Sequence, residues 1–327
     1  MTGSITGELR NALGVAGFAA SRAPRARMTP IYGLLGLSAS LAFESGARLR
    51  PMEAKAALVN PTRHGLVEDD AVSGTGAAPP SSTGGGAAVV IPALIRTEAE
   101  RETLQACVAA IAGDKAVQAI FVIDDGSPSP LSLVGCTVVH HTLNCGPAAA
   151  RNTGMRLALE AGAETIVFTD ADCSPTTGWA SAHAALQKTS PGVWAGHTVA
   201  AGSGVVSRFH DAIGTLMPRV FLGRGDEALY GPTCNLSISK DVAKSVAFDS
   251  TFPTFAFEDC DFCVRAHAAG FAVRASDRPL VKHHFDERVS GLLTTFHKYG
   301  RSLPLMRSKH PSYDAKMAIS QPPTAKQ

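Results

Sequence analysis

From residue 87 onward, short apolar runs alternate with segments whose apolar residues recur at helical intervals. Short runs rich in β-branched residues are typical of buried strands, and they cover Ala87–Leu94, Val117–Ile123, Thr137–His141 and Thr165–Phe168. The segments with helical spacing are 98–112 and 147–161, and the second opens with Pro147, as first turns of helices often do. This β-α-β-β-α-β order predicts an α/β fold with a mostly parallel sheet and helices on both faces.

Two of the predicted strands run into acidic residues. Asp124 and Asp125 follow one strand, and Asp170 and Asp172 follow another. In open α/β sheets, ligands bind at the carboxyl ends of the strands, and a hard divalent cation takes carboxylate and phosphate oxygens as ligands. The sequence therefore favours a nucleotide and cation site at this edge of the sheet. Solvent-exposed turns after the two strands would also be rich in aspartate and are the alternative explanation.

Composition excludes several classes of protein. The 327 residues carry a net charge of +2 and show no basic stripe interleaved with aromatic residues, so we expect no nucleic-acid partner. The sequence holds neither a GxxxxGK[ST] phosphate loop nor a GxGxxG after the first strand. Seven scattered cysteines favour a reducing compartment, and hence the cytoplasm. No apolar run reaches the roughly 18 residues that a transmembrane helix needs.

Residues 1–86 differ in amino-acid composition from the rest of the chain. Before Glu44 they hold a single acid against four arginines, and 73–86 is rich in Gly, Ser and Pro. This composition is typical of a disordered segment with a flexible linker. It is equally typical of an organellar transit peptide or of a start codon placed too early. We therefore predict a disordered or targeting segment at 1–86, a main domain at 87–303 and a tail at 304–327.

A second group of acids opens a predicted helix in the C-terminal half. Glu258, Asp259 and Asp261 precede apolar residues at helical spacing. Such a group of acids can serve a functional site. Acids in a first helical turn are also favoured by the helix dipole alone, so simple capping remains the alternative.

Cysteine and histidine pairs nearby raise the question of zinc. Cys260 and Cys263 form a CxxC, and His283 and His284 lie further along the chain. Because both cysteines fall inside the predicted helix, burial as small apolar side chains is the favoured interpretation. Adjacent residues of a strand point to opposite sides, so at most one of the two histidines can serve a site.

Six segments together resemble the family-2-type nucleotide-sugar glycosyltransferases with the GT-A fold. In chain order they are VVIPA at Val89, VIDDGSP at Val122, GPAAARNTGMRLAL at Gly146, FTDADCSPTTGW at Phe168, GPTCNLSISKDV at Gly231 and FEDCDFCVRAHAAGF at Phe257. The resemblance covers about residues 89–301 and leaves out the N-terminal segment. It implies a GT-A-type, Rossmann-like sheet.

The resemblance also implies a role for each matching residue. The donor nucleotide sugar would lie against Pro92, Asp124, Asp125, Arg151, Asn152, Asp170 and Ala171. Asp172 and His283, with His284 as the alternative, would ligate a divalent cation, Mn²⁺ or Mg²⁺. Asp259 would be the general base toward the acceptor hydroxyl, with Glu258 beside it. Asn235 and Arg301 would lie on the acceptor side.

The implied activity is metal-dependent transfer of a sugar, UDP-linked as the first guess, to a hydroxyl group. One base and attack from the opposite face imply inversion at the anomeric carbon. The acceptor is left open as a saccharide, a lipid or a small molecule, and so is peripheral association with a membrane. A nucleotidyltransferase and a catalytically silent nucleotide-sugar-binding module are the alternatives.

Overall fold

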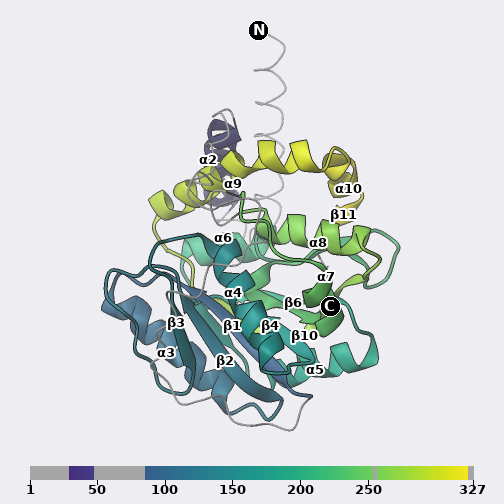
Figure 1. Cartoon of the computed structure of the whole chain (residues 1–327). Coiled ribbons are helices and arrows are strands. Elements are labelled where there is room, and N and C mark those ends of the chain that lie inside the picture. The colour runs from purple at the N-terminus through teal and green to yellow at the C-terminus, as the bar shows by residue number, and fades with distance from the viewer. Residues whose placement is uncertain (1–28, 48–84, 253–255, 323–327) are drawn as a thin grey trace.

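The computed structural model describes residues 29–47, 85–252 and 256–322. Its centre is an eight-stranded sheet in the order β3-β2-β1-β4-β9-β6-β10-β5 (Figure 1). The strands are β1 (Ala87–Ala93), β2 (Val117–Asp124), β3 (Thr137–His140), β4 (Thr165–Phe168), β5 (Cys173–Pro175), β6 (Val193–Ala200), β9 (Leu236–Ser239) and β10 (Val273–His283). β1 is parallel to β2 and β4, β2 to β3, and β6 to β10, whereas β9 and β5 run antiparallel to their neighbours.

Helices cover both faces of this sheet, which confirms the predicted fold class. On one face lie α4 (Pro147–Glu160), α7 (Lys240–Ser245) and α8 (Glu258–Ala268), and on the other lie α3 (Glu98–Ala112) and α5 (Trp179–Thr189). Val90 faces the first group and Val89 the second. Because both faces of β1 are buried, its sequence is continuously apolar rather than alternating.

Local sequence explains how the helices beside the site begin. Thr97 and Glu100 form a capping box at the start of α3. α4 starts at Pro147 and lies unusually close to β1, since a Cβ added to Gly154 would come 2.2 Å from Cγ1 of Val90. Arg151 precedes Gly154 by one helical turn and so lies on the same face of α4. The glycine therefore lets α4 bring Arg151 close to the sheet.

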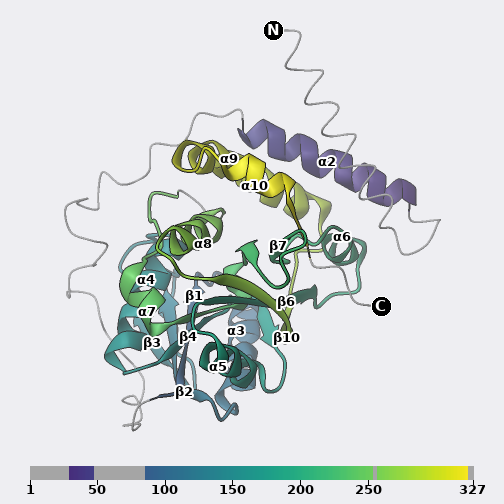
Figure 2. The same ribbon diagram turned by 90° about the vertical axis from the view of Figure 1, so that its right-hand side faces the viewer.

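A further layer of helices lies beyond α8 (Figure 2). It contains α6 (Val205–Ile213), α9 (Val289–Lys309) and α10 (Tyr313–Ala318), with a small sheet of β7 (Arg219–Phe221), β8 (Ala228–Tyr230) and β11 (Ser320–Gln321). Leu303, Met306 and Tyr313 are buried in one cluster with Cys260 of α8. The domain boundary expected between residues 303 and 304 falls inside α9, and residues 304–322 pack as part of the fold. At the other end, β1 starts at residue 87, where the domain was expected to begin.

The expectation that residues 1–86 lack structure is wrong for residues 29–47, which form α2 (Thr29–Ala47). α2 lies alongside α9, and its Leu35 and Ala39 are buried against Phe209 and Leu292. This partner lies far along the chain, so the local composition could not reveal it. Residues 1–28 and the linker at 73–84 lie outside the described residues. Among the helices that the structure describes, none is both long and apolar enough to cross a membrane.

Candidate functional site

The two aspartate pairs of the predicted site lie at the same edge of the sheet. In β2, Asp124 pairs with Ala93 of β1, and the amide of Asp125 donates to the Ala93 carbonyl at 2.8 Å. β4 flanks β1 on its other side and ends two residues before Asp170. The prediction that both acid pairs lie at one edge of the sheet is therefore confirmed.

Arg151 connects this edge to the start of α8. Its guanidinium is buried and donates to Asp170 Oδ1 and to Glu258 Oε1, each at 2.9 Å. Burial alone would lower the pKa of Arg151, but the negative charges of Asp170, Glu258 and Asp259 outweigh it and raise that pKa. The arginine is therefore a permanent positive charge that holds two acids from distant parts of the chain.

We expect Arg151→Gln to lower the free energy of unfolding by about 3–5 kcal/mol, because it leaves buried carboxylates without their cation. Arg156→Gln is the matched control on the same helix. Its partner Glu160 is 56% exposed, so that surface pair contributes at most about 1 kcal/mol. Urea unfolding of both variants measures the difference, and equal small losses would show that the buried network does not stabilise the fold.

Glu258 and Asp259 open α8 after a strained residue. Phe257 has φ 68°, in the left-handed region that a bulky side chain rarely adopts. Glu258 is buried, and burial together with the charge of Asp259 raises its pKa to about 7. Its Oε2 has no hydrogen-bond partner among the described groups. Asp259 is partly buried, and its carboxylate hydrogen-bonds to the side chain of Cys260 and, through Oδ1, to the amide of the same residue at 2.7 Å. Of the two acids, Asp259 is the one not held by Arg151.

Tyr299 of α9 lies near the same acids. Burial raises the pKa of its phenol, and the charges of Asp259, Glu258 and Asp170 raise it further. The third layer thus brings a neutral hydroxyl toward the carboxylate group.

Asp172 and His283 come together on the other side of the site. His283 Nε2 lies 3.3 Å from Asp172 Oδ1. His284 turns away, with its Nε2 2.9 Å from Ser174 Oγ, while its backbone amide donates to the Asp172 carbonyl. The structure therefore decides the choice between the two histidines, and His283 is the one beside Asp172. A carboxylate and an imidazole at this separation fit a divalent cation.

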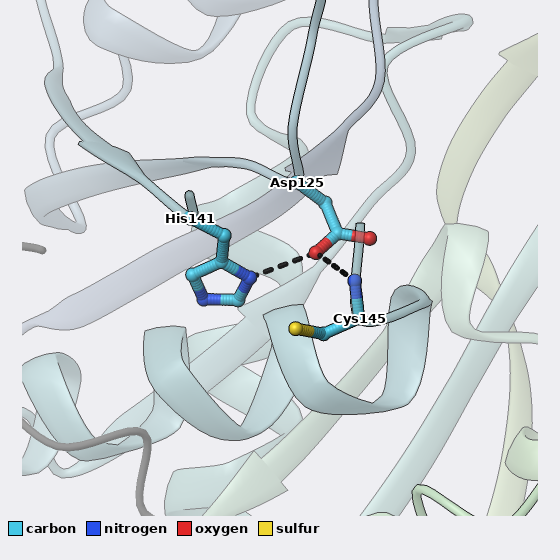
Figure 3. A group of neighbouring side chains, drawn as sticks. All are labelled: Asp125, His141 and Cys145. Carbon is cyan, nitrogen blue, oxygen red and sulfur yellow. Dashed lines mark hydrogen bonds and ion pairs between the residues drawn. The ribbon is translucent and has the colours of Figure 1, made fainter. Parts of the chain in front are cut away.

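The carboxylate of Asp125 contacts His141 and the backbone of Cys145 (Figure 3). Its Oδ1 contacts His141 Nδ1 at 2.8 Å and accepts from the amide of Cys145 at 2.9 Å, while Oδ2 accepts from the amide of Gly146 at 2.8 Å. His141 in turn contacts Thr153. Asp125 therefore holds the start of α4 in place. The contact with the donor that the resemblance implied stays a prediction.

Asp124 keeps a place in the expected donor site. Its carboxylate contacts His140 Nδ1 at 2.8 Å and accepts from the amide of Ser127 at 3.0 Å. It also lines a depression of about 400 Å³. The other lining residues are Gly126, Ser127, Pro130, Leu131, Ser132, His140 and His141. Pro92 and Ala171 are partly buried at the ends of β1 and β4 that border this edge.

Two asparagines of the predicted site form hydrogen bonds within the protein. Asn152 exchanges two hydrogen bonds with the backbone of Phe248 and so fixes the segment after α7. Asn235 is buried, and its amide is shared among Trp179, His183 and two backbone carbonyls. The four contacts of Asn235 engage both its amide nitrogen and its oxygen, whereas the two bonds of Asn152 leave it one N–H and one lone pair, so its role toward the donor stays a prediction. Arg301 lies partly buried on α9 and forms no ion pair with the acids of the described segments.

The zinc alternative at the CxxC is not supported. Cys260 and Cys263 are buried in α8, and within the described ranges neither belongs to a group of potential metal ligands. Asp261 is also structural, because its carboxylate contacts His310 at 2.8 Å and Arg265 at 2.7 Å. Of the acids in this turn, only Glu258 and Asp259 belong to the site.

Three residues near the site were missed by reasoning from sequence. His140 and His141 lie beside Asp124 and Asp125, and the parallel register of β3 with β2 was the signal that could have found them. Cys173 directly follows Asp172 and lies opposite His283 in the β5–β10 pair. A cysteine beside a DxD is visible in the sequence, but its partner strand is not.

Comparison with known proteins agrees with the resemblance. Residues 88–244 match the model of Glycosyl transferase family 2. The "Pre-mycofactocin glycosyltransferase" of Mycobacterium tuberculosis is 27% identical over 225 residues, which is 62% of this chain and 45% of that protein. This chain therefore matches less than half the length of that relative.

Solved structures of low identity are also similar. GalNAc-T7 with UDP, GalNAc and Mn²⁺ has a TM-score of 0.48 at 12% identity over 61% of this chain and 43% of that one. S. aureus TarS 1–349 in complex with UDP-GlcNAc has a TM-score of 0.44 at 18% identity, over 63% and 60% of the two chains. The part of the chain that resembles glycosyltransferase family 2, residues 88–244, includes Arg151 and Asp170 of the network at the sheet edge.

Proposed function

We propose that this protein transfers a sugar from a nucleoside diphosphate sugar, UDP-linked as the first guess, to an acceptor hydroxyl with inversion at the anomeric carbon. One observation carries the proposal: Arg151 forms two ion pairs, one with Asp170 just after β4 and one with Glu258 at the start of α8. This contact supports the proposal, because it holds Asp170, the acid expected on the nucleotide side, close to the start of α8, where the candidate base Asp259 lies. The reaction class also agrees with the family match of residues 88–244.

The donor nucleotide would occupy the depression beside Asp124. This carboxylate already accepts from Ser127 and contacts His140, and its oxygens keep further lone pairs for a ribose hydroxyl or a base imide. Asp170, whose side chain is 29% exposed, would face the ribose while Arg151 holds it in orientation. Pro92 and Ala171 would contribute backbone surface, not charge.

The diphosphate would lie toward Asp172 and His283. These residues fit a divalent cation, because a carboxylate oxygen and an imidazole nitrogen converge from neighbouring strands. A bound Mn²⁺ or Mg²⁺ supplies charge stabilisation for the departing diphosphate. Asp172 is half exposed, so it is accessible to a ligand from solvent.

Asp259 would take the proton from the acceptor hydroxyl. Its neighbour Glu258 is held by Arg151 and has its pKa raised to about 7 by burial, so we assign Glu258 to positioning. Tyr299 of α9 would border the place where the acceptor enters, and Arg301 lies two residues further along the same helix. A saccharide, a lipid or a small molecule each remains compatible with this face.

A donor screen tests the proposal. We would measure thermal stabilisation by UDP-, GDP-, CDP- and dTDP-sugars with Mn²⁺ or Mg²⁺, and release of the free nucleoside diphosphate. A ligand at about 100 times its Kd stabilises by roughly 2.7 kcal/mol, which is readily detected. Pyrophosphate release from a nucleoside triphosphate would favour a nucleotidyltransferase instead. Stabilisation without any release, across a range of acceptors, would favour a silent binding module.

A further inference from the structure

The cation site holds a residue that a magnesium site does not need. Asp172, Cys173 and His283 each offer one ligand atom, and these atoms lie within 4.8 Å of one another. We propose that these residues form a three-ligand site for a thiophilic divalent cation, with Zn²⁺ as its biological representative. The proposal goes beyond the hard cation assigned above, because it adds the thiol of Cys173 and changes the metal class.

The backbone holds the ligands in register. Cys173 of β5 lies directly opposite His283 of β10 in an antiparallel pair, and directly opposed residues project to the same face of a sheet. The amide of His284 also donates to the Asp172 carbonyl at 2.9 Å. The β5–β10 pairing thus fixes Cys173 and His283, and the hydrogen bond to the amide of His284 fixes the turn that carries Asp172, before any metal binds. Preorganisation of this kind lowers the cost of binding.

The distances suit zinc. Metal–ligand lengths near 2.0–2.3 Å in a tetrahedron imply roughly 3.4 Å between an oxygen and a nitrogen ligand. Asp172 Oδ1 and His283 Nε2 are already 3.3 Å apart. The ring of His283 packs against Phe285, and its buried Nδ1 has no hydrogen-bond partner among the described groups. No hydrogen bond within the described part of the chain therefore holds that ring nitrogen.

A second group with the same residue types shows the contrast. Asp125, His141 and Cys145 also lie close together, but their polar atoms are used within the protein (Figure 3). Asp125 accepts from two backbone amides and contacts His141, whose other ring nitrogen contacts Thr153. A metal there would have to break these bonds. In the group at Asp172, Cys173 makes a side-chain hydrogen bond with Cys234, while Asp172 Oδ1 and His283 Nε2 face each other at 3.3 Å.

Ligand chemistry sets the preference among metals. Thiolate favours zinc over magnesium, whereas carboxylate and phosphate oxygens suit magnesium and manganese. When the metal binds, the Cys173 S–H bond breaks, a sulfur–metal bond forms and the proton passes to the buffer. Three protein ligands leave a fourth position for an outside ligand. Zinc would therefore compete with Mn²⁺ or Mg²⁺ for Asp172 and His283.

Cobalt titration of the full chain, without nucleotide, tests the site. Co²⁺ replaces zinc and gives a near-ultraviolet sulfur-to-metal charge-transfer band only when a thiolate binds it. We expect this band in the wild type, its displacement by Zn²⁺ but not by Mg²⁺, and its absence in Cys173→Ser and Cys173→Ala. Zinc affinity measured against a chromophoric chelator should fall in these variants by more than the roughly 10- to 100-fold that loss of a second-shell partner costs.

Cys145→Ser is the matched control, because it removes the thiol of the other Asp-His-Cys group and should keep the band. His283→Gln should weaken it, which assigns the band to this site even if the Cys173 variants fail to melt cooperatively. No band in the wild type, or a band that survives in folded Cys173→Ala or is lost in folded Cys145→Ser, would overturn the proposal. None of these measurements depends on turnover, so their failure is distinguishable from failure of the proposed function.

Discussion

Asp259→Asn is expected to lower turnover by about 10²- to 10⁴-fold, the contribution of a positioned general base. The donor KM should change little, because the carboxylate of Asp259 hydrogen-bonds to Cys260 rather than to the residues assigned to the donor and the metal. Turnover and donor binding measured on the same preparation separate the two effects. Glu258→Gln should disturb stability as well, since Glu258 is buried and bound to Arg151.

The competing explanation for Asp259 is a simple helix cap. It predicts a lower melting temperature, by the roughly 0.3–1 kcal/mol of one first-turn charge, with activity kept. Asp241→Asn is the matched control, since Asp241 is an exposed acid in the first turn of α7. Asp261 cannot serve, because its ion pairs with His310 and Arg265 make it structural. A stable and fully active Asp259→Asn protein would remove the base assignment and leave Glu258 as the candidate.

Asp172→Asn is expected to lower turnover by about 10²- to 10³-fold, which corresponds to the several kcal/mol that a bound cation supplies to a developing charge. The substitution keeps the shape of the side chain and removes the charge that faces His283. Donor affinity should fall together with turnover, because the diphosphate loses its counter-charge. Removal of the metal from the wild type with EDTA should reproduce both losses.

Asp277→Asn provides the control for Asp172, since Asp277 is exposed on β10 and belongs to no group of potential ligands in the described part of the chain. It should leave turnover, donor affinity and the response to EDTA unchanged. Full activity of the wild type in EDTA, with added Mn²⁺ giving no increase, would contradict a metal-dependent mechanism. Asp172 and His283 would then need another explanation.

The sequence alone determined four strands of the central sheet, β1 to β4, the helices α3 and α4 between them, and the acids that follow β2 and β4. α3 spans residues 98–112, as the spacing of its apolar residues predicted, and β1 and β2 depart from their predicted ranges by one residue at their ends. These features are local, because burial on one face or on both imposes its own period on the chain. Asp170 and Asp172 follow a strand for the same reason, and the carboxyl edge of a parallel sheet is where ligands bind.

Only the tertiary structure decided what each of these side chains contacts. Asp124 and Asp125 are adjacent and have the same charge. The carboxylate of Asp125 accepts hydrogen bonds from the backbone just before α4, whereas Asp124 lines an open depression. The same holds for His283, which faces Asp172, and for its neighbour His284, which does not. α2 is a helix because α9, far along the chain, covers it. The spacing of apolar residues along a segment indicates which of its faces are buried. The residues that a side chain contacts depend on which distant elements pack against it, and no local pattern encodes them.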